Sequence, residues 1–220
     1  MTGHPLGEPV ILDGVDALVA VIEGMRARSA RPGARLLVGL VGAPGAGKST
    51  VAAELAAALP AAVVLPMDGF HLPQFRLVAL GRRERMGAPD TFDVEGFVAL
   101  LRALRDDRRS TEPLRAPSFD REVEEPVPDA IELGPGASTV IVEGNYLLHD
   151  GVGWPQAAPL FDLIVALRLD DGVRRERLIA RHVAHGKTPA DARAWVLGPD
   201  EVNARLIAPG LERADYSLSG

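Results

Sequence analysis

The chain has no cysteine among its 220 residues, so it can form neither disulfide bonds nor thiolate zinc sites. It also lacks an apolar run long enough to cross a bilayer, and its N-terminal residues lack the basic-then-apolar pattern of a signal peptide. These absences predict a soluble cytoplasmic protein that makes no use of a membrane.

A surplus of positive charge is also missing, because the formal net charge is -6 and the isoelectric point is about 5.4. Nucleic-acid binding needs surplus lysine and arginine to neutralise phosphates, so this balance argues against a nucleic-acid partner. Binding of one nucleotide needs only a local positive site. Hydrophobic residues make up 47% of the chain, enough for the core of a single domain over residues 1–220.

Short apolar segments alternate with helical segments along most of the chain. Strands are expected at 36–41, 62–66, 139–142 and 163–167, and helices at 13–28, 48–59, 171–185 and 189–197. This alternation predicts an α/β fold of three layers, in which helices cover both faces of a parallel sheet. The segment 72–127 is rich in proline, arginine and aspartate, and we expect it to pack across the carboxyl ends of the strands.

A glycine-rich loop follows the first predicted strand and matches the phosphate-loop pattern G-x-x-x-x-G-K-[ST] completely. Its residues are Gly42, Ala43, Pro44, Gly45, Ala46, Gly47, Lys48 and Ser49, followed by Thr50. Glycines let backbone amides approach phosphate oxygens, and the helix that begins near Lys48 adds the positive end of its dipole. Lys48 is expected to contact the β- and γ-phosphates, and the Ser49 hydroxyl to bind Mg²⁺. A chance turn is the alternative, but the preceding strand and the following helix favour a P-loop NTPase fold that binds ATP and Mg²⁺.

Two classes of P-loop protein lack their signatures here, because neither the N-K-x-D element of GTPases nor an L-S-G-G-Q-like element is present. Four other segments occur in order: MDGFHL at 67–72, GAPDTFD at 87–93, FDR at 119–121 and VEGNYLL at 142–148. In this order, they resemble the uridine kinase, phosphoribulokinase and bacterial pantothenate kinase group of P-loop kinases. The resemblance extends from about Leu36 to the C-terminus, although uridine kinases usually have an aromatic residue where His71 stands and pantothenate kinases are longer.

The resemblance implies an ATP-dependent kinase that phosphorylates a hydroxyl group of a small molecule. Nucleosides, pantothenate-like alcohols and sugars all remain open as acceptors. Proteins of this group often form dimers, so a homodimer is a further expectation. A function from another class also remains open, namely a regulatory module that hydrolyses ATP without a small-molecule acceptor.

Two carboxylates are the main candidates for chemistry. Asp68 follows the second predicted strand, and the resemblance implies that it accepts the proton of the substrate hydroxyl. A turn cap is the alternative role, since Asp-Gly is a common turn pair. Glu143 ends the β-branched run 140–142 and is expected to hold Mg²⁺ through its water shell, the alternatives being a helix cap or an ion pair.

Further side chains are candidates for contacts with the substrate: His71, Arg85, Asp120, Arg121 and Tyr146. The two arginines among them suit an anionic group or the transferring phosphoryl group. For each of the five, an ordinary surface position is the alternative.

A basic stripe follows the last predicted strand. Arg174, Arg177, Arg181 and His185 recur at spacings of three and four, so they share one face of a helix. The resemblance implies a lid helix, at about 171–187, whose arginines close over the phosphates, with Arg177 and Arg181 as its catalytic residues. A solvated face with local ion pairs is the alternative. A metal site at His182 and His185 is disfavoured because no third ligand lies nearby in the sequence.

Overall fold

A six-stranded parallel sheet forms the centre of the computed structural model, which describes residues 8–29, 34–106 and 112–219. The strand order is β1-β8-β7-β2-β6-β3. The strands are β1 (Val10–Leu12), β2 (Leu36–Gly42), β3 (Ala62–Pro66), β6 (Thr139–Gly144), β7 (Leu163–Arg168) and β8 (Tyr216–Ser219). The predicted α/β class with a parallel sheet is confirmed, and β1 and β8 extend one edge of the sheet beyond the predicted strands.

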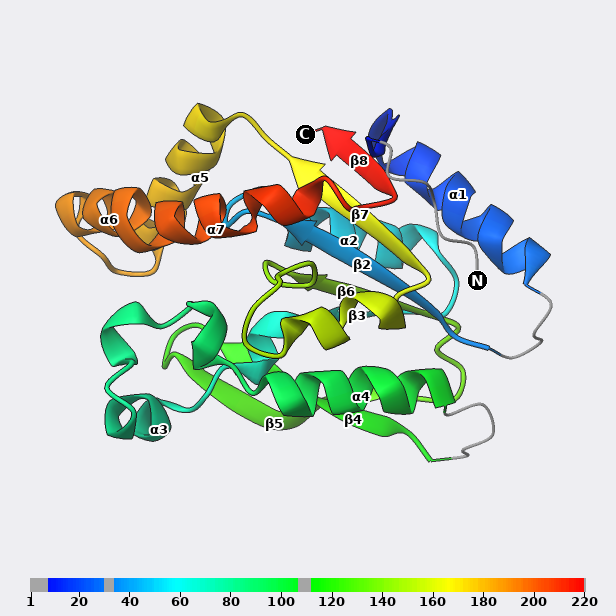
Figure 1. Cartoon of the computed structure of the whole chain (residues 1–220), viewed down its shortest axis with the longest axis horizontal. Coiled ribbons are helices and arrows are strands. Elements are labelled where there is room, and N and C mark those ends of the chain that lie inside the picture. The colour runs from blue at the N-terminus through cyan, green and yellow to red at the C-terminus, as the bar shows by residue number, and fades with distance from the viewer. Residues whose placement is uncertain (1–7, 30–33, 107–111, 220) are drawn as a thin grey trace.

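Helices cover both faces of this sheet (Figure 1). On one face, α1 (Gly14–Arg28) and α2 (Lys48–Ala58) bury Leu18 and Leu55 against Val38 of β2. On the other face lie α4 (Val94–Asp106) and α7 (Glu201–Leu211), whose Phe97 and Ile207 belong to the second core cluster. Each such fully buried apolar side chain contributes about 1.5–3 kcal/mol of stability.

The segment 72–127 holds more regular structure than its composition predicts. It contains α3 (Gln74–Ala79), α4 and the strand β4 (Leu114–Asp120), which pairs antiparallel with β5 (Glu125–Leu133). The hairpin packs on the 3₁₀ turn Met67–Phe70 that follows β3, close to the carboxyl ends of the strands. Further 3₁₀ turns lie at Arg83–Arg85, Pro89–Thr91, Trp154–Gln156 and Ala158–Leu160.

The chain after β7 forms a second group of helices at the same end of the sheet. These are α5 (Asp171–Ala184) and α6 (Pro189–Trp195), and a π-helical segment, Val196–Asp200, joins α6 to α7. In Figure 1, α5 and α6 lie on the side to which β2 points, above α3 and the hairpin. A helix therefore lies where the lid helix is expected, and it ends at Ala184. Its action as a lid stays a prediction.

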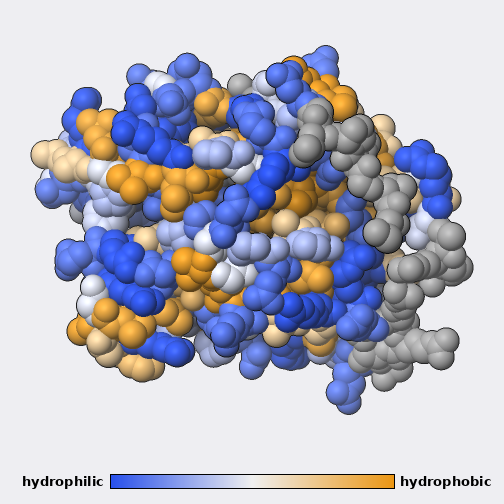
Figure 2. All heavy atoms as spheres, in the orientation of Figure 1, coloured by the Kyte–Doolittle hydropathy of each residue, from blue (hydrophilic) through white to orange (hydrophobic). Residues whose placement is uncertain are grey.

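The surface is mostly polar, with apolar patches over α3 and α7 (Figure 2). Phe75 and Val78 of α3 and Val202 of α7 are among the exposed apolar side chains. In the described part of the chain, no helix combines the length and the apolar character that a membrane span requires.

Candidate active site

A cavity of about 630 Å³ lies at the carboxyl ends of the strands, between the glycine-rich loop, the turn of the hairpin and α5. Its walls are formed by Gly45, Gly47, Lys48, Ser49, Thr50, Arg121, Arg177, Leu178, Arg181 and His185. The phosphate-loop residues and the arginines predicted to act with them therefore meet around one space.

Lys48 begins α2 and lies folded over the glycine-rich loop. Its ammonium donates hydrogen bonds to the carbonyl oxygens of Gly42 (2.9 Å) and Ala43 (3.1 Å) and to Oδ1 of Asn145 (2.6 Å). Burial lowers the pKa of Lys48, although the negative charge of Glu143 acts to raise it. Gly47 precedes the helix at φ +91°, a conformation that side-chain-bearing residues rarely adopt, so the loop needs glycine there.

Ser49 and Glu143 bring a hydroxyl and a carboxylate together beside Lys48. The Ser49 hydroxyl donates to Oε1 of Glu143 at 2.8 Å, and burial raises the pKa of this carboxyl group. Mg²⁺ prefers hard oxygen ligands of this kind, and its remaining ligands are usually water molecules and substrate phosphates. The described residues contain no group of three His, Cys, Asp or Glu side chains that could hold a metal ion without such ligands.

Asp68 lies in the 3₁₀ turn after β3 and faces the hairpin. Its carboxylate accepts a hydrogen bond from Arg121 at 2.7 Å. Burial alone would raise its pKa, but electrostatic interactions with His71, Arg121 and Lys48 hold the pKa of Asp68 below its ordinary value. The turn packs so tightly on β4 that a Cβ atom at Gly69 would lie 2.1 Å from the carbonyl oxygen of Pro117. Only glycine permits this contact, which fixes the neighbouring Asp68 against the hairpin.

His71 lies between two aromatic rings next to Asp68. The ring centres of Phe92 and Phe119 are 4.0 and 4.7 Å from that of the histidine. Its Nδ1 atom lies 2.8 Å from the backbone oxygen of Asp68, and burial lowers the pKa of His71 despite the nearby carboxylate. A stacked imidazole thus lies beside the aspartate.

The basic stripe of α5 divides into two parts. Arg177, Arg181 and His185 line the cavity, as a lid helix requires. Arg174 instead is 1% exposed, donates to the Pro44 oxygen at 3.4 Å and forms an ion pair with Glu201. The expectation that all four side chains share one functional face is therefore wrong for Arg174, because its position in the first turns of α5 directs it under the glycine-rich loop.

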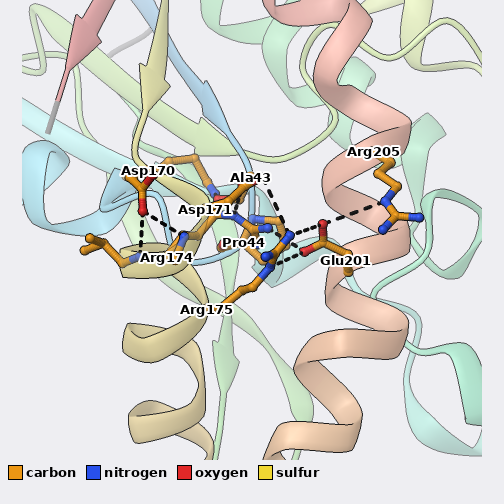
Figure 3. Close-up of polar contacts among 11 residues, drawn as sticks. Ala43, Pro44, Asp170, Asp171, Arg174, Arg175, Glu201 and Arg205 are labelled. Atoms are coloured by element: carbon orange, nitrogen blue, oxygen red, sulfur yellow. Dashed lines mark hydrogen bonds and ion pairs between the residues drawn. The ribbon is translucent and has the colours of Figure 1, made fainter.

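Glu201 joins α7 to α5 (Figure 3). Its carboxylate accepts hydrogen bonds from Arg174 (2.6 Å) and from Arg175 (2.8 and 3.1 Å). Arg205 approaches the same carboxylate at 3.7 Å from the solvent side. Hydrogen bonds from Arg175, outweighing burial, lower the pKa of Glu201 to about 2.

Three of the predicted substrate contacts lie elsewhere. Tyr146 is fully buried, and its hydroxyl donates to the Gly87 oxygen at 2.5 Å, because this side chain packs into the aromatic core. Arg85 is paired with Asp90 and does not line the cavity. Asp120 caps the hairpin turn, where its Oδ1 atom accepts hydrogen bonds from the backbone amides of Glu122 and Val123.

A second cavity of about 240 Å³ adjoins the first on the side of α1 and β8. The two share Gly47, Thr50 and Arg177, and the second is otherwise mainly apolar. Its other lining residues are Gly14, Val15, Ala46, Val51, Glu54, Leu167, Leu218 and Ser219.

Sequence reasoning missed four side chains of this region. Asn145 was detectable, since it lies in the segment EGNY, two residues after Glu143. Phe92 and Phe119 also lie within quoted motifs, yet their stacking on His71 depends on the tertiary fold. Glu201 carried no local signal, because it acts on arginines 26 and 27 residues away.

Comparison with known proteins shows the family, although no protein-family model matches the chain. The chain is 39% identical over 145 residues to an ATP-dependent kinase-like protein of Aspergillus versicolor, covering 63% of this chain and 84% of that protein. It is 36% identical over 196 residues to a candidate uridine kinase of Schizosaccharomyces pombe, covering 84% and 83% of the two chains. The crystal structure of a candidate fructose transport system kinase from Silicibacter sp. TM1040 matches with a TM-score of 0.80 at 40% identity, over 92% of this chain and 98% of that one. The chain therefore belongs to the uridine kinase-like group of P-loop small-molecule kinases.

Proposed function

We propose that the enzyme transfers the γ-phosphoryl group of ATP to a hydroxyl of a small molecule, with Mg²⁺ as the cofactor and Asp68 as the general base. The observation that carries this proposal is that Lys48, Arg177 and Arg181 line the 630 Å³ cavity, hereafter the phosphate cavity, while Asp68 is hydrogen-bonded to Arg121 in its wall. Relatives with kinase names support the same reaction class.

The two adjoining cavities suit the two ends of ATP. The polar cavity beside the glycine-rich loop fits the phosphates, since backbone amides and a helix N-terminus favour anions. The mainly apolar cavity beside Val15 and Leu218 fits the adenine base, because flat apolar ligands favour such walls. Arg177 lies at the junction of both cavities, where it would contact the phosphate chain.

Each group would have a distinct part in the reaction. The acceptor oxygen forms a bond to the γ-phosphorus while the bond between that phosphorus and the ADP oxygen breaks, and the hydroxyl proton passes to Asp68. Lys48, Arg177 and Arg181 would neutralise charge on the transferring group. Ser49 and Glu143 would hold Mg²⁺, which supplies further charge neutralisation when bound.

Acceptor-dependent release of ADP tests this function. The protein is incubated with ATP and Mg²⁺, with and without members of a panel of nucleosides, sugars and pantothenate-like alcohols. ADP release that rises severalfold with one acceptor, together with phosphorylated acceptor detected by mass spectrometry, supports the kinase. Slow hydrolysis at the same rate with every acceptor contradicts it and favours a regulatory ATPase.

A further inference from the structure

A third cavity, of about 260 Å³, lies between the hairpin turn and the C-terminal half of α5. It shares Arg121, Arg181 and His185 with the phosphate cavity. The other lining residues are Phe119, Glu122, Val123, Glu124, His182 and Lys187. Because Arg121 also donates to Asp68, this cavity lies next to the proposed base.

Two cations of this cavity have no carboxylate partner. Among residues 8–29, 34–106 and 112–219, neither Arg181 nor Lys187 takes part in an ion pair, although both line the cavity. The Lys187 ammonium lies 4.7 Å from the centre of the Trp195 ring. This cation–π contact holds the ammonium in place and leaves its charge available for a ligand.

Most of the carboxylates near the cavity are already paired. Glu124 forms an ion pair with Arg83 at 2.6 Å, and Asp68 forms one with Arg121 at 2.7 Å. Glu122 is exposed at the hairpin turn and offsets one of the two free cations. Asp200 lies 3.0 Å from Nε2 of His182, and its negative charge also acts on Arg181. The positive charge that remains for a ligand is therefore centred on Lys187, in the loop that follows α5.

The opposite wall, made by the hairpin, carries two apolar side chains among its charged residues. Phe119 and Val123 of the hairpin region line it, and Phe119 also stacks on His71. A ligand that fits both walls has a small carbon body and an anionic group at one end. A neutral polyol or nucleoside would leave the two cations unpaired, which gives it no advantage over water at that wall.

We propose that the acceptor is a small hydroxylated anion, whose carboxylate or phosphate binds between Lys187 and Arg181 while its hydroxyl reaches Asp68. This inference rests on the proposed function and specifies its substrate class. The transfer itself is the same: the acceptor oxygen bonds to the γ-phosphorus, the bond to ADP breaks, and the proton passes to Asp68. Lys187 is a binding residue in this account and takes no part in the transfer.

Matched acceptors that differ only in charge test the substrate class. The probes are glycerol with glycerate, panthenol with pantothenate, and ribose with ribose 5-phosphate, each measured by coupled ADP release with the full chain. At least one anionic member should exceed its neutral partner by about tenfold or more in kcat/KM. The carboxylate and phosphate probes together distinguish which anionic group the cavity prefers.

Variants of Lys187 then test the assigned residue with the best anionic probe. K187Q should raise the KM for that probe about tenfold with the KM for ATP unchanged, since one charge-assisted contact is lost. K187R keeps the charge and should restore the KM to within a few-fold. Arg193 is an exposed cation on neighbouring α6 that lines none of the three cavities, so R193Q should leave the acceptor KM unchanged.

The two proposals fail in different ways. A neutral acceptor that matches or exceeds its anionic partner overturns the anionic class and leaves the kinase function standing. An unchanged acceptor KM in K187Q overturns the role of Lys187 in the same way. ADP release that ignores every acceptor overturns the kinase function, and the substrate class with it.

Discussion

The guanidinium of Arg174 lies 2.6 Å from the carboxylate of Glu201, and both side chains are almost fully buried. This ion pair joins α5 to α7, and Arg174 also donates to the backbone of the glycine-rich loop. The first turns of α5 are thereby fixed to the phosphate loop, while Arg177 and Arg181 further along the helix face the cavity. The helix α5 is thus anchored at its N-terminal end, so we expect any movement of Arg177 and Arg181 to come from its later turns.

Replacing Arg174 by alanine should destabilise the protein by about 1–3 kcal/mol, because it removes a buried charge-assisted hydrogen bond while Arg175 still pairs with Glu201. Urea unfolding monitored by circular dichroism measures this change. The control is Arg205→Ala, whose side chain is 79% exposed and 3.7 Å from the same carboxylate, and which should change stability by less than about 1 kcal/mol. Equal effects of the two variants would contradict a special role for the buried pair.

The stability of the protein should fall at acidic pH because Glu201 becomes protonated. Its folded-state pKa is about 2, below the ordinary value of 4.5, so its contribution is fully present above pH 4.5. Protonation removes this contribution as the pH falls from 4.5 towards 2, by up to about 3 kcal/mol. The measurement is the unfolding free energy of wild type and Glu201→Gln across this range. The difference between the two should shrink as the pH falls, and a constant difference would argue against the lowered pKa.

Lys48→Ala should reduce phosphoryl transfer by about a hundred- to a thousandfold, because it removes the positive charge nearest the loop carbonyls of Gly42 and Ala43. Circular dichroism should show an unchanged fold. Steady-state ADP release with the best acceptor provides the rate. Turnover close to that of the wild type would contradict the assignment of Lys48 to the proposed ATP site.

Arg177→Ala and Arg181→Ala should each lower kcat by at least about tenfold and weaken ATP binding less, if their charges act mainly on the transition state. Turnover and ATP titration by calorimetry separate the two effects. Arg193→Ala, on the surface of α6, is the matched loss of an arginine outside the cavities. A normal kcat in both cavity variants would contradict a catalytic role for these arginines and favour the alternative of a solvated helix face.

Much of the central fold could be predicted because its signals are local. The apolar runs of β2, β6 and β7 are continuous, as expected for strands buried on both faces, and the glycine-rich loop places the start of α2 directly. The helix α4 also carries a clear pattern, with Val94, Phe97, Val98, Leu101 and Leu104 on its buried face. Its position inside a segment rich in proline and arginine concealed it.

Other features depend on contacts that no short pattern records. The prolines of β4 and β5 argue against strands, yet Pro117 is tolerated because the pairing register shifts between Ala116 and Ser118. The burial of Arg174 depends on Glu201, which lies on another helix. Tyr146 stands near Glu143 in the sequence, but its side chain belongs to the core.

The central claim is that Asp68 accepts the proton of the acceptor hydroxyl, and Asp68→Asn tests it most directly. Asparagine keeps the shape of the side chain and still accepts from Arg121, but it has little capacity to take a proton. The measurement is kcat with the best acceptor at several concentrations of Mg²⁺, together with ATP affinity. The account predicts a kcat lower by about a hundred- to ten-thousandfold, an unchanged affinity for ATP and no recovery with added Mg²⁺. A kcat close to that of the wild type, or one that Mg²⁺ restores, would contradict it and leave Asp68 as a turn cap or a metal ligand.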